Sequence, residues 1–346
     1  MMNSISRRRK LLLASLGCVF ANFNSWAQAP KFPTRPVRMV VPFPVGGGVD
    51  AVARLVAQML SQKLGQQVVV ENIPGASGQI GTQAVVRSQS DGHTLLFAPP
   101  TPITIAEQFE PKPAYDVGRD LVPAALIGRN PAVIVINSAV KANTLQEFFA
   151  LVKREPSKYF YGSSGMGHAF HLTSEILFTQ AGVSMTHVPY QGSGPAVLGV
   201  LSGDVQFLVQ SVEAVREHVK SGRLRALATM EPNRIDAFPE LPTLTESALS
   251  NLGIMNWYGV FMPAKTPPEL LGFWERELLA LAKAPEFEKR MRTMSFDPVA
   301  YSSQDFMRMM VIERNQWAAA IKAANVSTKK QWYFAGQIFS SVPNTL

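Results

Sequence analysis

The stretch VRMVVPFPVGGGVD, residues 37–50, decides how the rest of this chain is interpreted. Its first part, Val37 to Phe43, is a short apolar run rich in β-branched residues and predicts a buried strand. Three glycines follow at positions 46–48, and Asp50 stands where a helix N-cap is expected. Apolar residues then recur at helical spacing as far as Leu64, which predicts a helix. A strand, a glycine turn and a helix N-terminus form a potential anion site, because the turn exposes backbone N–H groups and the helix adds partial positive charge.

This stretch matches neither of two common nucleotide-binding motifs. A dinucleotide fingerprint, G-x-G-x-x-G, would need glycine at position 51, which is Ala51. A P-loop would need Gly-Lys-Ser/Thr after the turn. A tight strand–helix connection without any ligand explains an isolated glycine turn equally well. The functional interpretation therefore depends on the rest of the chain.

The composition favours a globular protein with a substantial core. The chain has 346 residues, enough for two domains, and 47% of them are hydrophobic while 17% are charged. Outside the N-terminal leader, no apolar run is long enough to span a bilayer. Four of the basic residues, Arg7 to Lys10, lie in that leader, so the formal charge of +8 becomes 8 − 4, or +4, without it. No remaining basic run predicts a nucleic-acid surface.

Residues 1–27 have the features of a secretory signal peptide. The basic segment precedes an apolar segment, Leu11 to Ala21, and Ser25-Trp26-Ala27 offers small residues at the two positions that signal peptidase reads. We expect cleavage after Ala27. The basic segment also fits a twin-arginine leader loosely, and Cys18, the single cysteine, could mark a lipoprotein, although the residues before it fit that signal poorly. Once the leader is removed, the mature chain has no cysteine, so it can form neither a disulfide nor a cysteine metal site. For an exported protein of this composition, we expect a location in the bacterial periplasm.

Strand and helix patterns alternate along most of the chain. Over the first hundred residues this alternation predicts a parallel sheet with helices on its faces, and the same alternation restarts at Thr144, as in an α/β protein. Besides the first strand and helix, the sequence predicts strands at 67–71, 94–98, 159–162, 184–189, 205–209, 224–229 and 257–263, and helices at 79–87, 144–154, 213–220, 268–283 and 303–324.

One break suggests how the chain divides into domains. Residues 121–137 hold two apolar runs separated by Gly128-Arg129-Asn130-Pro131, as expected where a chain crosses between domains. We therefore expect residues 28–129 and 232–346 to form a discontinuous first domain, and residues 130–231 to form the second. The tail after Asn325 carries no clear pattern.

Three loops share one design: Val45–Asp50, Ser163–His168 and Tyr190–Gly194. Each follows a predicted strand, is rich in glycine and small hydroxyl residues, and precedes a predicted helix. In open α/β sheets such loops lie at the carboxyl ends of strands, where ligands bind. If one loop comes from the first domain and two from the second, they can face each other across a cleft. Helix N-termini, hydroxyl groups and water can hold a small carboxylate there without an arginine.

Catalytic and metal-binding patterns are weak. A nucleophile elbow centred on Ser164 would need glycine at Met166. His168 and His171 lie one helical turn apart, but no third ligand stands at a supporting position, so a zinc site is not expected. His187 alternates within a strand and is better explained as a packed or cleft-edge residue. Trp257 and Tyr258 could form a cleft wall, although core packing explains them better.

Eight ordered blocks resemble the Bug-type, or TctC-like, extracytoplasmic solute receptors of tripartite tricarboxylate transporters. The blocks are PFPVGGGVDAVAR, VVVENIPGASGQIGT, SDGHTLLFAP, YGSSGMGHAFHLTSEILF, THVPYQGSGPAVLGVLSGDVQF, SGRLRALATMEPNR, LPTLTESA and FMPAKTPPELL. They extend from about Pro33 to about Ala324. The resemblance implies a type II periplasmic binding protein fold: two doubly wound α/β domains, joined by crossover strands, that close on a ligand. It also implies a small carboxylate ligand, such as a di- or tricarboxylate, an acidic amino acid or an aromatic acid.

The family's binding loops fall on Phe43–Asp50, Ser163–His168 and Tyr190–Ser193. We expect ligand-binding residues at Phe43, Val45, Gly46, Gly47, Gly48, Asp50, Thr101, Ser163, Ser164, Gly165, Gly167, His168, Tyr190, Gln191, Gly192, Ser193 and Gln210.

The chain departs from the family pattern at two of these positions. His168 stands where the family usually has serine or threonine, and it could narrow the pocket or pair with a second carboxylate. Gln210 stands where the family usually has aspartate after the VQF strand. The missing negative charge leads us to expect that Gln210 disfavours a ligand with an amine.

The sequence therefore predicts a periplasmic solute-binding receptor that captures a small organic carboxylate in an interdomain cleft. It would deliver the ligand to a membrane permease or report it to a sensor, with no catalysis, cofactor, metal or nucleic acid, and as a monomer. Two other classes stay open: a serine-dependent α/β hydrolase or transferase that uses Ser163 or Ser164 with a histidine, and a structural periplasmic protein that no longer binds a ligand.

Overall fold

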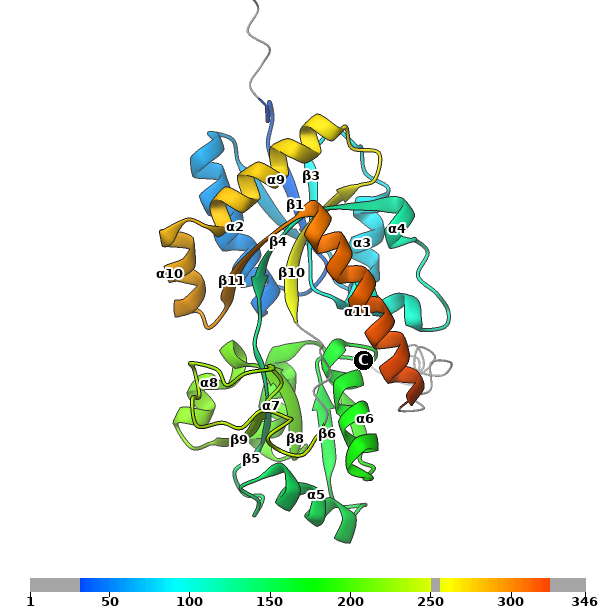
Figure 1. The fold of residues 1–346 in the computed structure, drawn as a ribbon, viewed down its shortest axis with the longest axis vertical. Coiled ribbons are helices and arrows are strands. Elements are labelled where there is room, and N and C mark those ends of the chain that lie inside the picture. Colours follow the sequence, from blue (N-terminus) through cyan, green and yellow to red (C-terminus); the bar gives the residue numbers. More distant parts are fainter. Residues whose placement is uncertain (1–31, 250–255, 324–346) are drawn as a thin grey trace, which may run out of the picture. The chain divides into compact units, whose positions relative to one another are not determined.

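The structure, a computed structural model, describes residues 32–249 and 256–323, which contain two β-sheets and the helices that cover them (Figure 1). The predicted signal peptide, with Cys18, and the tail after Asn325 lie outside the described residues. Both sheets belong to one compact unit that starts at Arg35. Within the described ranges, no helix is both long enough and apolar enough to cross a membrane.

The first sheet has six strands in the order β11–β4–β10–β3–β1–β2. Its strands are β1 (Val37–Val41), β2 (Val68–Asn72), β3 (Thr94–Ala98), β4 (Leu121–Arg129), β10 (Trp257–Pro263) and β11 (Asp297–Ser302). Strand β1 runs parallel to β2 and β3, and Met39 pairs with Val70 on one side and Leu95 on the other. Strand β10 is antiparallel to both β3 and β4. The apolar strand Val37–Val41 therefore lies inside the sheet, where most of its side chains are buried.

The second sheet has five strands in the order β7–β6–β8–β5–β9. They are β5 (Ala132–Asn137), β6 (Phe160–Ser163), β7 (Thr186–Pro189), β8 (Phe207–Ser211) and β9 (Leu224–Thr229). Strand β6 is parallel to β7 and β8, and Gly162 pairs with Val188 and Leu208. Strand β5 is antiparallel to β8 and β9.

Helices connect and cover the strands of both sheets (Figure 1). They are α2 (Gly48–Leu64), η1 (Ala76–Gly78), α3 (Gln79–Val86), η2 (Thr101–Ile105), η3 (Ala106–Gln108), α4 (Val117–Asp120), α5 (Leu145–Arg154), α6 (Ala169–Ala181), α7 (Ser193–Ser202), α8 (Val212–Lys220), α9 (Pro268–Ala282), α10 (Pro285–Thr293) and α11 (Ser303–Ala323).

The chain passes from the first sheet to the second through Asn130 and Pro131, the two residues between β4 and β5. A second crossing precedes β10, and the two crossings meet where the Asn130 N–H donates to the Asn256 carbonyl oxygen, 2.7 Å away. Strands β1–β4, β10 and β11 form the first sheet and strands β5–β9 form the second, which agrees with a first domain made of two separate segments of the chain. The domain boundaries themselves, at 129/130 and 231/232, stay a prediction.

Some local predictions were wrong. The N-cap of α2 is Gly47, not Asp50, which is the third residue of the helix. The sequence did not predict α10, because only Phe287 and Met291 of its residues are buried and its apolar stripe is correspondingly short. It also did not predict β11, an edge strand that contains Pro298 and pairs with β4 in a broken register.

Helix α11 connects the two sheets (Figure 1). Phe306 and Met310 in its first half pack in the core of the first sheet. Trp317 and Ile321 in its second half pack against residues of α6, among them Leu172. The helix therefore stabilises the position of α6, whose N-terminus contributes to the site described below.

Between these two apolar contacts, α11 carries a buried carboxyl group. Glu313 accepts hydrogen bonds from Thr104 Oγ1 and Trp257 Nε1, both at 2.9 Å. Burial raises the pKa of Glu313 to about 7, although these hydrogen bonds act in the opposite direction.

This pKa predicts a pH-dependent contribution to stability. The folded protein keeps a proton on Glu313 that the unfolded chain, with a glutamate pKa of about 4.3, has already lost. The contribution of this group to the free energy of unfolding therefore falls as the pH rises from about 4.5 to about 7. Replacing Glu313 by glutamine removes the titration, so we expect the melting temperature of Glu313→Gln to rise relative to the wild type across this window.

Thermal unfolding at closely spaced pH values measures this difference. Glu217→Gln, at an exposed position on α8, is the matched control and should keep a constant difference from the wild type. A flat difference for Glu313→Gln would show that the buried carboxyl group does not titrate as predicted.

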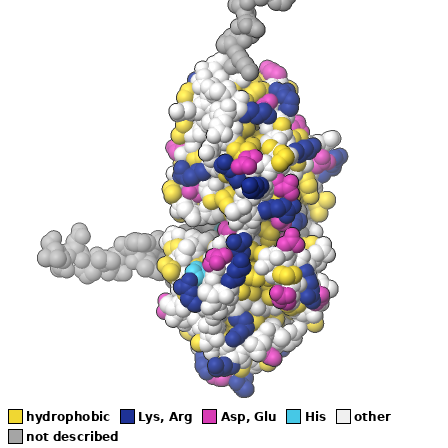
Figure 2. Space-filling model, turned by 90° about the vertical axis from the view of Figure 1, so that its left-hand side faces the viewer, with side chains coloured by type: hydrophobic (Ala, Val, Ile, Leu, Met, Phe, Trp, Pro, Cys, Tyr) yellow, Lys and Arg dark blue, Asp and Glu magenta, His cyan; other side chains and the backbone are white. Residues whose placement is uncertain are grey.

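The exposed surface carries charges of both signs. On the face shown in Figure 2, lysine and arginine side chains alternate with aspartate, glutamate and apolar side chains, and no broad basic area forms on that face.

Candidate functional site

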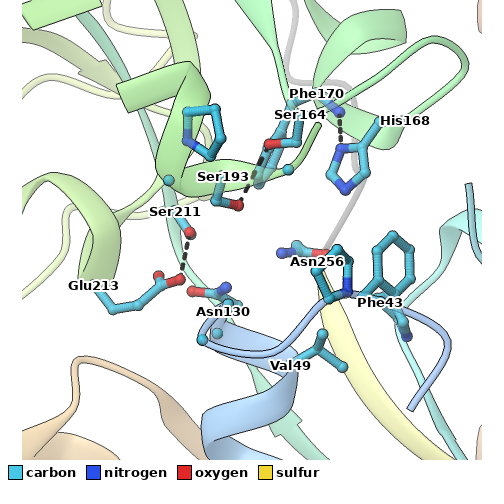
Figure 3. Close-up of a pocket in the computed structure, with 18 of the residues that line it drawn as sticks. Phe43, Val49, Asn130, Ser164, His168, Phe170, Ser193, Ser211, Glu213 and Asn256 are labelled. Atoms are coloured by element: carbon cyan, nitrogen blue, oxygen red, sulfur yellow. Dashed lines mark hydrogen bonds between the residues drawn. The ribbon is translucent and has the colours of Figure 1, made fainter. Parts of the chain in front are cut away.

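A cavity of about 170 Å³ lies between the loops of the two sheets (Figure 3). Its lining comes from the β1–α2 loop, the β6–α6 loop, the β7–α7 loop, the start of α8 and the two crossing segments. The described lining residues are Phe43, Pro44, Val45, Gly46, Gly47, Gly48, Val49, Pro99, Asn130, Ser164, His168, Phe170, Gln191, Gly192, Ser193, Gly194, Pro195, Ser211, Glu213, Asn256 and Tyr258. Ligand pockets usually have about 300–1,000 Å³, so this cavity suits a small ligand.

Four helices begin at this cavity: α2, α6, α7 and α8. Residues of the first turn or the N-cap of each helix are among the lining residues: Gly48 in α2, His168 before α6, Ser193 in α7 and Ser211 before α8. Each helix N-terminus presents N–H groups without an intrahelical acceptor and carries partial positive charge. No lysine or arginine occurs among the described lining residues. The arrangement can therefore hold an anion through backbone groups.

Two serine hydroxyl groups from neighbouring loops add to this site. Ser164 Oγ and Ser193 Oγ lie 3.4 Å apart, each close to the N-terminus of a helix (Figure 3). Behind them, Gln210 Nε2 donates to Ser164 Oγ at 3.3 Å. Gln210 itself is fully buried and does not line the cavity. It thus positions Ser164 and has no direct contact with the cavity.

The β1–α2 loop is held in shape by Asp50. Its carboxylate accepts hydrogen bonds from the Gly46 N–H at 3.0 Å, from Asn72 Nδ2 at 2.9 Å and from Arg54 Nε at 3.0 Å. Burial alone would raise the pKa of Asp50, but these hydrogen bonds hold it below its ordinary value. Asp50 therefore stabilises the glycine turn, while the turn itself faces the cavity.

His168 is the N-cap of α6, and its Nδ1 accepts a hydrogen bond from the Phe170 N–H at 3.3 Å. Its ring also meets the Phe43 ring edge-on, with 6.2 Å between the ring centroids. Burial lowers the pKa of His168 to about 4. The ring is therefore neutral at pH 7, and it carries its proton on Nε2 because Nδ1 is an acceptor. His168 can donate a hydrogen bond, but it brings no positive charge.

The structure places many of the predicted site residues together at the cavity. Those that line it are Phe43, Val45, Gly46, Gly47, Gly48, Ser164, His168, Gln191, Gly192 and Ser193. The predicted residues that do not line it are Asp50, Thr101, Ser163, Gly165, Gly167, Tyr190 and Gln210. Tyr190, for example, packs its ring against Gly199 of α7. The role of each predicted residue in binding stays a proposal.

Sequence reasoning missed several polar residues of the cavity. Asn130 belongs to the crossing segment, Asn256 to the return crossing, and Ser211 and Glu213 to the β8–α8 connection. Ser211 and Glu213 did have one signal in the sequence. They stand between a predicted strand and a predicted helix, where a serine followed by an acidic residue is typical of a helix N-terminus. Tyr258 was considered as a cleft wall, and it lines the cavity, whereas Trp257 packs in the core.

Glu213 is the one formally charged side chain among the described lining residues. Ser211 Oγ donates to Glu213 Oε1 at 2.7 Å. Burial raises the pKa of Glu213 to about 7, and the hydrogen bond from Ser211 acts against that shift. The carboxyl group approaches the N-terminus of α2 so closely that a Cβ atom on Gly48 would lie 2.5 Å from Oε1 and 3.0 Å from Tyr258 Oη.

The serine–histidine contact that the structure describes does not line the cavity, and the described residues contain no cluster of metal ligands. Ser163 Oγ lies 2.8 Å from His187 Nε2, but Ser163 is completely buried and does not line the cavity. The His187 ring stacks on His171, with 4.1 Å between centroids, and burial lowers the pKa of His187 to about 4. No group of three or more possible metal ligands occurs within the described ranges.

The contact at Gly48 predicts a loss of binding on substitution. In Gly48→Ala the new methyl group must displace Glu213 and Tyr258, so we expect about tenfold weaker ligand binding. Isothermal titration with the best ligand of the screen described below measures the effect. Gly272→Ala on α9 is the control, since Gly272 does not line the cavity and its Cβ atom would meet nothing within 4 Å. Equal losses in both variants would contradict this account of the close approach at Gly48.

Comparison with known sequences gives a consistent set of relatives. Residues 52–326 match the family described as "Tripartite tricarboxylate transporter family receptor". Protein BugT of Bordetella pertussis is 33% identical over 321 residues, which cover 92% of this chain and 98% of BugT. A UPF0065 protein from the tcbD-tcbE intergenic region of Pseudomonas sp. strain P51 is 33% identical over 320 residues, which cover 92% and 94% of the two chains.

Several solved structures also resemble the fold of this chain. The structure of "R. palustris Rpa4515 with adipate" has a TM-score of 0.81 at 29% identity and covers 85% of this chain and 98% of its own. Periplasmic binding protein BugD has a TM-score of 0.80 at 30% identity, with 86% and 100% covered. MatC (Rpa3494) of Rhodopseudomonas palustris "with bound malate" has a TM-score of 0.77 at 25% identity, with 84% and 100% covered. The predicted two-domain α/β fold of type II periplasmic binding proteins is confirmed.

Proposed function

This chain belongs to the receptors of the tripartite tricarboxylate transporter family, and from that premise we propose that it captures a small organic carboxylate in the cavity between its two sheets. The resemblance inferred from the sequence blocks is confirmed. The observation that carries the proposal is the convergence of four helix N-termini on a cavity whose described lining has no lysine or arginine. Two related structures hold the dicarboxylates adipate and malate, which supports a carboxylate ligand here as well.

In this proposal the ligand carboxylate binds between the glycine turn of α2 and the paired hydroxyl groups of Ser164 and Ser193. Backbone N–H groups at the start of α2 and α7 would donate to it, and hydrogen bonds to a charged group are stronger than those between neutral groups. His168 Nε2 would be a further donor. The cavity volume of about 170 Å³ favours a mono- or dicarboxylate of a few carbons over a larger acid.

Capture would involve closure of the two sheets around the ligand. Asn130 and Pro131, the two residues between β4 and β5, would form part of the hinge, and the Asn130 N–H is hydrogen-bonded to the Asn256 carbonyl oxygen there. A further contact joins the two lobes: Ser77 Oγ in η1 donates to the Met166 carbonyl oxygen in the β6–α6 loop at 2.8 Å. A ligand that contacts both lobes would stabilise this closed arrangement.

The proposal extends to location and partners. The chain would be exported to the periplasm, lose its leader after Ala27, and deliver its ligand as a monomer to a membrane permease or a sensor. It would need no metal or cofactor and would perform no catalysis. The burial of Ser163 and the stacked position of His187 give no support to the serine hydrolase alternative.

A thermal-shift screen tests the central proposal. The mature protein, from Gln28 onward, is heated with carboxylates, the corresponding amides and neutral analogues. A ligand at about 100 times its dissociation constant adds roughly 2.7 kcal/mol to stability, which corresponds to a rise of several degrees. We expect a rise with at least one small carboxylate and none with its amide. No shift with any acid, together with no acid released from the denatured protein in mass spectrometry, would contradict the receptor function.

A matched pair of serine variants on α7 tests the placement of the carboxylate. Ser193→Ala removes a hydroxyl group that lines the cavity, and a lost hydrogen bond to a charged group should weaken binding by about 10- to 100-fold. Ser202→Ala, at the other end of the same helix, removes a hydroxyl group that bonds only locally, to Gly199 and Asp204. Titration calorimetry should show unchanged affinity in this control. Unchanged affinity in Ser193→Ala would place the carboxylate elsewhere.

A further inference from the structure

Glu213 puts a carboxyl group into a cavity that is otherwise arranged to hold an anion. The side chain comes from the first turn of α8 and lies next to the Asn130 amide at one end of the pocket (Figure 3). Its stem is partly accessible, whereas its Oε2 atom is buried. A carboxyl group at this place needs an explanation that a plain anion site does not provide.

Two buried acceptor atoms at this end of the cavity have no hydrogen bond of ordinary distance and angle among the residues that the structure describes, although the Asn130 side chain and the N–H groups of Glu213 and Ala214 lie near enough to the Glu213 carboxyl group to oppose the rise of its pKa. The two acceptor atoms are Glu213 Oε2 and Asn130 Oδ1. The other atom of each group is occupied: Ser211 Oγ donates to Glu213 Oε1, and Asn130 Nδ2 donates to Tyr258 Oη at 2.8 Å. Asn130 is only 2% exposed, so bulk water does not satisfy it. Buried acceptors without a donor are unfavourable, and both of these belong to residues that line the ligand cavity.

We propose that Glu213 and Asn130 form a subsite for an N–H or O–H donor of the ligand, so that the receptor selects carboxylates that carry an ammonium or hydroxyl group. This inference rests on the proposed function, because it assigns a binding position to the second end of the same ligand. The first end, the carboxylate, would lie at the hydroxyl groups of Ser164 and Ser193. A donor from the ligand would satisfy both orphan acceptors at once.

The subsite changes the expectation for Gln210. The sequence suggested that glutamine at this position leaves the cavity without a negative charge and disfavours an amine. In the structure, Gln210 Oε1 accepts a hydrogen bond from the backbone N–H of Ser211, and its side chain is fully buried. The single proton of the Ser211 hydroxyl group is assigned to Glu213, the nearer acceptor. Glu213, three residues further along, supplies the carboxyl group instead. Under the proposal, the absence of aspartate at position 210 would not disfavour a donor-bearing ligand, and the earlier expectation for Gln210 stays a prediction that the same titrations test.

Two arrangements within the protein would satisfy the same atoms without a ligand. A proton on Glu213 could be donated to Asn130 Oδ1, or the Asn130 amide could turn over, donate to Glu213 and accept from Tyr258. In either case the cavity would show no preference for a donor on the ligand. Ligand selectivity is therefore the property that separates the proposal from both arrangements.

Titration calorimetry at pH 8 with matched acids tests the proposal. One series is butyrate, 2-hydroxybutyrate and 2-aminobutyrate, and the second is succinate, malate and aspartate. Within at least one series, we expect an acid with a donor group to have a dissociation constant at least about tenfold lower than that of the acid without a donor. The wild type, Glu213→Gln and Glu217→Gln are compared, and the melting temperature of each variant confirms that it folds.

The glutamine variant distinguishes the two kinds of donor. Glutamine keeps an acceptor oxygen but has no negative charge, so Glu213→Gln should weaken the ammonium-bearing acid about tenfold and the hydroxy acid by less than about threefold. Glu217→Gln, an exposed position on the same helix that does not line the cavity, should leave both affinities unchanged.

Three results would overturn the proposal. Equal affinities for acids with and without a donor would show that the acceptors are satisfied within the protein. An unchanged preference in Glu213→Gln, for both the ammonium and the hydroxy acid, would place the donor elsewhere. Failure of every acid in both series and in the broader screen would overturn the receptor function itself, and the subsite with it.

Discussion

The helices α2, α6, α7 and α8 all begin at one cavity, and their unsatisfied N–H groups are the interaction on which the site depends. A parallel connection from strand to helix brings the carboxyl end of the strand and the N-terminus of the next helix to the same edge of a sheet. Strands β1, β6, β7 and β8 each lead into one of these helices. Because the two sheets face each other at these edges, positive partial charge accumulates without a cationic side chain. A ligand carboxylate can then replace water at several N–H groups of both lobes at once, which links binding to closure.

Two buried polar residues, Asp50 and Gln210, do not line the cavity but hold the loops around it. Asp50 binds the Gly46 N–H and so fixes the glycine turn from behind. Gln210 donates to the Ser164 hydroxyl group while its carbonyl oxygen accepts from Ser211. Such buried hydrogen bonds restrict the loops to one conformation, and a preorganised site loses less entropy when the ligand binds. The cavity can therefore have few direct contacts and still be specific.

The sequence predicted the parts of the site that depend on local pattern. The glycine turn at 46–48 and the hydroxyl-rich loops containing Ser164 and Ser193 follow strands and precede helices, so their place at the sheet edge follows from topology alone. Asn130 and Glu213 could not be found in this way. Asn130 lies in a crossing segment between strands, and Glu213 reaches the cavity only because α8 of the second sheet faces α2 of the first. Contacts between segments far apart in the sequence leave no repeating pattern of residue types. The sequence also does not reveal that Gly48 makes room for the Glu213 carboxyl group because it has no Cβ atom.

The charge balance of the cavity gives Glu213 a consequence for ligand choice. Each helix N-terminus is equivalent to roughly half a positive charge, so the four that meet here amount to about two charges before solvent screening. An ionised Glu213 reduces this to about one, which matches a ligand with one net negative charge: a monocarboxylate, or an amino dicarboxylate whose ammonium group lies at Glu213. A dicarboxylate brings two negative charges and is balanced only when Glu213 is protonated. Because burial raises the pKa of Glu213 to about 7, both protonation states of Glu213 lie close in free energy near neutral pH, and the charge of the bound ligand would favour one of them.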